Sequence, residues 1–146
     1  MTNELSNLRK DALIGGCING IINGVINWFQ VKGESSILLT NDAISSREHT
    51  VFSGAVPLAV SLAFILTSVA YFTSKKESKP PYFPKVFVLG LKHSAYAFGL
   101  VTIFALLLQR FVGSIAVSPV LAAGIAGLTA AIVGTIVNYE TNRALS

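Results

Sequence analysis

Four long runs of mostly apolar residues alternate with short polar segments along the chain. The runs extend approximately over residues 12–31, 54–73, 94–111 and 119–139. Each is close to the ~20 residues that an α-helix needs to cross the hydrocarbon core of a bilayer. We therefore expect an all-α integral membrane protein in which residues 1–146 form a single domain of four transmembrane helices.

The composition strengthens this prediction. Hydrophobic residues make up 52% of the chain and charged residues only 12%, whereas soluble domains carry about 25% charged residues. The net charge of +4 is spread over the short polar segments and forms no basic patch of the kind that binds nucleic acid. The expected partner is the lipid bilayer, and nucleic acid is excluded.

The basic residues also predict an orientation. Eight of the 11 lysines and arginines fall on the side shared by the two termini and the middle loop, and three on the other side. Because cytoplasmic loops are enriched in lysine and arginine, we expect both termini in the cytoplasm and the protein in a plasma or inner membrane. The eight are Arg9, Lys10, Lys75, Lys76, Lys79, Lys85, Lys92 and Arg143; the three are Lys32, Arg47 and Arg110.

Short signals mark helix starts and a faint internal repeat. "SSRE" (45–48) has the spacing of a capping box, and Ser118-Pro119 fits an N-cap followed by the first helical residue. "VAYFTSK" (69–75) and "VNYETNR" (137–143) end the second and fourth runs in similar ways, and "AVP" (55–57) and "VSP" (117–119) open them. This repeat suggests two tandem helical hairpins.

The first run contains polar residues at a regular spacing. Asn19, Asn23 and Asn27 recur every four residues, and Gln30 follows one turn later. On a helix of about 100° per residue, they share a face about 140° wide with three glycines. The complete face consists of Gly16, Asn19, Gly20, Asn23, Gly24, Asn27 and Gln30.

The fourth run repeats the design with smaller residues. Gly127, Gly134 and Asn138 fall within an arc of about 120°, together with Ala123, Gly124, Ala131 and Thr135. Isoleucines and a valine occupy the opposite side. Two of the four predicted helices therefore carry a face that is suited to a partner.

Two interpretations of these faces remain open. Small residues four apart let helix backbones approach closely, and asparagine adds hydrogen bonds across such a seam. Alternatively, polar residues at membrane depth line a solute or ion path, because carboxamides both donate and accept hydrogen bonds. The sequence alone does not choose between a packed seam and a wet path.

Groups that carry other chemistry are scarce. No carboxylate lies inside a predicted span, and His49 and His93 fall at opposite rims, where a solvated or interfacial position is expected. Cys17 is the single cysteine, which excludes an internal disulfide and a cysteine metal cluster. No catalytic, cofactor or metal motif is present, so we expect a protein that is not an enzyme.

The preferred hypothesis is a small permease or channel for an uncharged or weakly polar solute, or for an ion held by carboxamides. Since four helices rarely enclose a path alone, the asparagine face would converge in a homo-oligomer. The alternative is a non-transporting accessory or assembly subunit whose asparagine and glycine face packs on a helix of another membrane protein.

Overall fold

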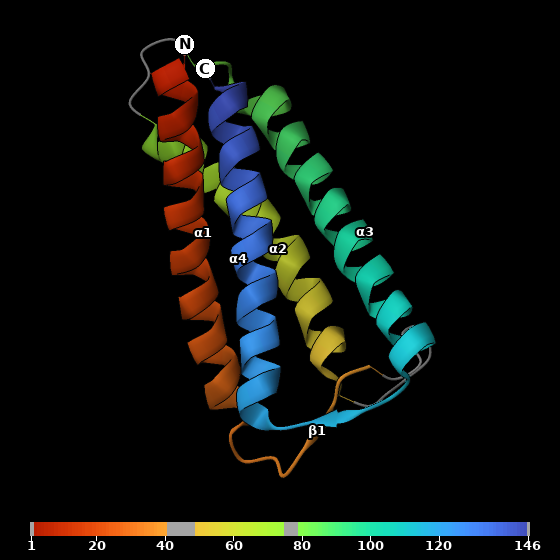
Figure 1. Ribbon diagram of the computed structural model, residues 1–146. Helices are drawn as coiled ribbons and strands as arrows, with labels where there is room; N and C mark the ends of the chain where they lie inside the picture. Colours follow the sequence, from red (N-terminus) through yellow and green to blue (C-terminus); the bar gives the residue numbers. More distant parts are fainter. Residues whose placement is uncertain (1, 41–48, 75–78, 146) are drawn as a thin grey trace.

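The protein is a bundle of four long helices with a two-stranded ribbon at one end (Figure 1). The computed structural model describes residues 2–40, 49–74 and 79–145. The all-α prediction with four candidate spans is confirmed. In chain order the elements are α1 (Thr2–Val31), β1 (Ile37–Leu38), α2 (Val51–Thr73), the π-helical turn η1 (Tyr82–Val86), α3 (Phe87–Val112), β2 (Ala116–Val117) and α4 (Pro119–Ala144).

Side-chain caps define where α2 and α4 begin. The Thr50 hydroxyl accepts a hydrogen bond from the Ser53 amide, and the Ser53 hydroxyl accepts one from the Thr50 amide, which completes a capping box. The predicted capping box at 45–48 lies outside the described residues. The predicted N-cap at Ser118 is confirmed, because its hydroxyl accepts a hydrogen bond from the Leu121 amide at 3.3 Å.

The helix α4 lies at the centre of the bundle. It packs against α1 on one side and α2 on another, while α3 packs mainly against α2. Of the most apolar stretch of α4, 44% is buried, compared with 17 to 22% in the other helices. The tightest pairs are therefore α1–α4 and α2–α3, whereas tandem hairpins would have paired α1 with α2 and α3 with α4.

Small residues four apart allow the α2–α3 pair to pack closely. The buried face of α2 consists of Ala55, Ala59, Ala63 and Thr67, and that of α3 includes Gly90, His93, Ala97, Val101 and Ala105. Alanine and glycine at this spacing let two backbones approach, which is the usual packing mode of helices in lipid. His93 is the one large polar residue on the buried face of α3 among the described residues.

The bundle has two distinct ends. Both chain termini lie at one of them, which we call the terminal end (Figure 1). At the opposite strand end, Ile37 of β1 pairs with Val117 of β2 in antiparallel register. The ribbon ties the α1–α2 connection to the α3–α4 connection. The helix α3 diverges from α4 toward the strand end (Figure 1).

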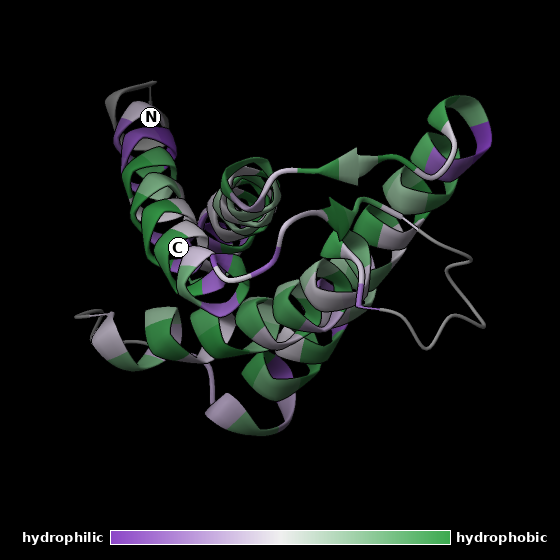
Figure 2. Ribbon diagram, turned by 90° about the horizontal axis from the view of Figure 1, so that it is seen from below, coloured by the Kyte–Doolittle hydropathy of each residue, from purple (hydrophilic) through white to green (hydrophobic). Residues whose placement is uncertain are grey.

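The outer surface of the bundle is strongly apolar. Hydrophobic residues cover outward-facing as well as inward-facing helix surfaces (Figure 2), and Ile21, Ile103 and Val120 are among the large side chains that are more than half exposed. In the described part of the chain, four helices are long and apolar enough to span a bilayer. The chain is thus a multi-pass integral membrane protein whose exposed apolar faces suit lipid. The spanning segments are Ser6–Val31, Val51–Thr73, Tyr82–Val112 and Pro119–Ala144.

Candidate functional site

The three glycines of the asparagine face lie against α4. A Cβ atom added to Gly20 would lie 2.9 Å from the carbonyl oxygen of Gly127, and one added to Gly16 would lie 2.7 Å from that of Ala131. At Gly24 the corresponding distance to the Ala123 carbonyl oxygen is 3.5 Å. The two antiparallel backbones therefore approach so closely that no larger residue fits at Gly16 or Gly20 without a shift.

The residues singled out on α4 lie in the same seam. A Cβ on Gly127 would be 2.8 Å from the Gly20 carbonyl oxygen, and one on Gly134 would be 3.4 Å from the Gly16 Cα. Asn138 reaches α1 as well, since its Nδ2 lies 2.6 Å from the place of a Cβ on Gly15. The seam thus brings together the small-residue faces of the first and fourth runs.

The asparagines border this seam and bond within their own helix. Asn19 Nδ2 donates to the Gly15 carbonyl at 2.9 Å, and Asn23 Nδ2 donates to the Asn19 carbonyl at 2.8 Å. Such bonds to the carbonyl four residues earlier satisfy amide donors without a partner helix. Asn27 is half-buried, and Gln30 is exposed near the strand end. The side-chain amides of Asn19 and Asn23 thus already donate one hydrogen bond each within α1, whether the face is a packed seam or a wet path.

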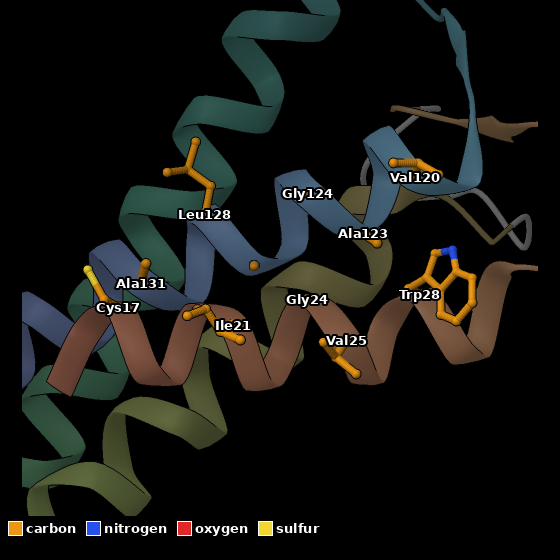
Figure 3. A pocket seen from close by; sticks show the side chains of 12 residues that line it. Cys17, Ile21, Gly24, Val25, Trp28, Val120, Ala123, Gly124, Leu128 and Ala131 are labelled. Atoms are coloured by element: carbon orange, nitrogen blue, oxygen red, sulfur yellow. The ribbon is translucent and has the colours of Figure 1, made fainter. Parts of the chain in front are cut away.

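An open groove runs along one flank of the seam. Its lining includes the α1 side chains Cys17, Ile21, Val25 and Trp28 and the α4 side chains Val120 and Leu128 (Figure 3). Its volume is about 640 Å³, and its described lining includes none of the asparagines. The groove is apolar and shallow, so it offers a surface for hydrocarbon rather than a polar site.

A second cavity separates α3 from α4, where these two helices make few contacts. This α3–α4 cleft has a volume of about 620 Å³. Most of its lining is apolar, and its polar groups come from the helix turns nearest the terminal end. The lining residues are Leu89, Lys92, His93, Ala95, Tyr96, Ala97, Gly99, Leu100, Ile103, Val133, Ile136, Val137 and Glu140.

His93 is the most enclosed of these polar groups, at 5% exposure. Its Nδ1 lies 2.8 Å from the hydroxyl oxygen of Thr67 on α2, and Thr67 itself is fully buried. The expectation of a solvated histidine was therefore wrong. His93 belongs to the buried small-residue face of α3, and its hydrogen bond to Thr67 joins this face to the buried face of α2.

Glu140 of α4 faces the same cleft. It lines the cleft together with His93. Glu140 also forms a 4.0 Å ion pair with Arg143, whose side chain is exposed, while that of Glu140 is about half exposed. Among the described residues, no group of three or more histidine, cysteine, aspartate or glutamate side chains could hold a metal ion.

Sequence reasoning missed the cleft for a physical reason. Helical periodicity places His93 on one face with Gly90, Ala97 and Val101, and that small-residue stripe was a usable signal of burial. The pattern does not say that α3 would diverge from α4, because this depends on the packing of both helices against α2. The cleft is therefore a tertiary feature.

Comparison of the chain with models of known protein families, with curated proteins and with solved structures found no match. Its function must be inferred from its own residues.

Proposed function

We propose that the protein is a small membrane permease whose solute-binding part is the α3–α4 cleft. The observation that carries the proposal is the burial of His93, an ionisable side chain inside a membrane-spanning helix, at the wall of this cleft. Ionisable groups at membrane depth are costly and typically serve substrate or ion pathways. A concave apolar site with a few convergent polar groups is also the usual form of a small-molecule site.

The packing of the bundle suggests how such a site could alternate between two sides. The pairs α1–α4 and α2–α3 are each closely packed, and α3 touches α4 at few places. Tilting of α3 relative to α4, with the α2–α4 contact kept, would open and close the cleft. Movement of one helical bundle against another around a fixed site is the general pattern of secondary transporters.

The proposed setting is a plasma or inner membrane with both termini in the cytoplasm. The described lysines and arginines support this orientation, because six of them belong to the terminal side and only two to the strand side. The six are Arg9, Lys10, Lys79, Lys85, Lys92 and Arg143, and the two are Lys32 and Arg110. The cleft's polar groups would then open toward the cytoplasm.

Thiol accessibility tests the proposal. In a Cys17→Ser background, single cysteines at Gly99 and Ile136 would line the cleft, whereas cysteines at Phe98 and Leu128 would lie on exposed apolar surface of the same helices, outside the cleft. A thiol reacts as the thiolate and needs water. We expect a charged thiol reagent added to inside-out vesicles to label the first pair and spare the second. Equal labelling of both pairs, or protection of all four, would contradict the proposal.

One observation favours a second candidate, the accessory subunit. The helix α1 packs mainly against α4, so most of its apolar side chains, including Ile18, Ile22 and Phe29, are exposed. This face could bind another membrane helix or a second copy of the chain. A range of oligomer sizes on dilution in detergent would favour the accessory subunit, whereas a homo-oligomeric pore requires one closed ring.

A further inference from the structure

The hydrogen bonds of Thr67 determine which nitrogen of His93 carries the proton. A threonine hydroxyl has one hydrogen to donate. Thr67 Oγ1 lies 2.8 Å from the Ala63 carbonyl oxygen and 2.8 Å from His93 Nδ1. Both bonds form together only when the hydroxyl donates to Ala63 and accepts from an Nδ1–H group. In the neutral ring, Nε2 then keeps a free lone pair.

His93 and Glu140 both line the polar end of the cleft. Since Nδ1 is bonded to Thr67 of α2, Nε2 is the ring nitrogen that is left for a ligand. A neutral imidazole nitrogen and a carboxylate are both hydrogen-bond acceptors. The walls beyond them, toward the strand end, consist of apolar residues such as Leu100, Ile103 and Val133.

We infer that the α3–α4 cleft binds an amphipathic primary amine. Its ammonium group donates hydrogen bonds to His93 Nε2 and to the Glu140 carboxylate, and its apolar body lies between α3 and α4. This inference rests on the proposed function, since it names the class of solute that the permease would accept. It replaces the uncharged solute expected from the asparagine face, because the cleft offers two acceptors, one of them an anion.

Two neighbouring cations affect the charge that a ligand meets. Arg143 pairs with Glu140 at 4.0 Å, but the side chains are 65% and 46% exposed, and exposed ion pairs are weak. A ligand ammonium can therefore compete for the carboxylate. Lys92 lies at the rim of the cleft and is exposed. It should repel a cationic ligand, so its removal should strengthen amine binding, whereas removal of an acceptor should weaken it.

The experiment uses the full chain in phosphatidylcholine nanodiscs, whose lipid head has no N–H group. The chain has two histidines, so His49→Gln leaves a single ¹⁵N-histidine signal set from His93. We expect Nδ1 to be protonated and Nε2 not. Hexylamine should shift the Nε2 signal saturably. Hexyltrimethylammonium, which has charge but no donor, and hexanoate should not.

Substitutions separate the two acceptors from a general loss of structure. Glu140→Gln should weaken hexylamine binding about tenfold, since a hydrogen bond to a charged group is worth about one tenfold step or more. Lys92→Gln should tighten it severalfold. His93→Asn keeps a donor to Thr67, but its side chain ends short of the Nε2 position. The variant should therefore fold and bind hexylamine about tenfold more weakly. Competition with a dansyl-labelled alkylamine measures this binding. Glu140 and Lys92 are on the rim of the cleft, so their variants still test amine binding if His93→Asn fails to fold.

The outcomes distinguish this inference from the proposed function. A protonated Nε2, equal binding of hexyltrimethylammonium, or no response to hexylamine would overturn the amine assignment, while water access to Gly99→Cys and Ile136→Cys would still support a permease. Protection of those cysteines would remove the permease proposal even if an amine binds. Adding phosphatidylethanolamine to the nanodiscs identifies the source of the amine. An Nε2 shift like that caused by hexylamine means that the cleft binds a lipid head group, and no such shift means that it binds a free amine.

Discussion

His93 on α3 and Thr67 on α2 are joined by a buried hydrogen bond of 2.8 Å between Nδ1 and Oγ1. The Thr67 hydroxyl donates its own hydrogen bond to the Ala63 carbonyl oxygen at 2.8 Å. A polar side chain in an apolar contact is tolerated when its hydrogen-bonding groups are satisfied. This bond therefore holds the histidine at the wall of the cleft and links the two helices of the α2–α3 pair.

Replacing Thr67 by valine should destabilise the protein. The change keeps the shape of the side chain but leaves the Nδ1–H group of His93 without its acceptor, which costs about 1–3 kcal/mol. Unfolding in mixed micelles by sodium dodecyl sulfate titration measures the free energy of unfolding. Thr67→Ser, which keeps a hydroxyl, is the control and should lose less. Wild-type stability in Thr67→Val would show that the ring finds another partner.

Alanine substitutions at two glycines of α4 should differ in their effect on stability, because only one of them lies in the α1–α4 seam. A Cβ on Gly127 would lie 2.8 Å from the Gly20 carbonyl oxygen, whereas nothing lies within 4 Å of one on Gly124. Both alanine substitutions gain about 0.5–1 kcal/mol of helix propensity, but only Gly127→Ala should add a clash worth about 1–3 kcal/mol. The same denaturation assay compares them. Equal stability of the two variants would contradict the close approach of α1 and α4.

The asparagine face should be largely protected from water. Asn19 and Asn23 donate to carbonyls of their own helix, and Asn19 lies beside Gly134 in the seam. In a Cys17→Ser background, we expect cysteines at Asn19 and Asn23 to resist a charged thiol reagent, as should the outward-facing controls at Ile18 and Val25. Labelling of the asparagine positions alone would restore the hypothesis of a wet path along α1.

Cysteines at the two ends should report opposite sides of the membrane. Ser36 near the strand end and Ala144 at the terminal end are both exposed. In intact cells, an impermeant thiol reagent should label Ser36→Cys at once and Ala144→Cys only after permeabilisation, because the excess of basic residues at the terminal end favours the cytoplasm. The reverse order of labelling would mean an inverted orientation.

Part of the α1–α4 seam was accessible from the sequence. The spacing of Gly16, Gly20 and Gly24 places them on one face, and the same holds for Gly127 and Gly134. What periodicity could not show is that these two faces meet each other. The repeat in the sequence suggested hairpins of consecutive helices, whereas the closest backbone approach in the described residues joins the first helix to the last.

The sequence by itself determined the class of the protein and the number and approximate position of its long helices. Runs of about 20 apolar residues have one stable form in a bilayer, because a helix satisfies its backbone polar groups internally. Tertiary structure decided the rest: Gln30, placed on the polar face, is exposed, while His93, expected at the rim, is buried beside Thr67. Which helix face meets which depends on contacts between residues far apart in the chain, and the α3–α4 cleft exists because α3 packs on α2 and leaves α4 partly uncovered.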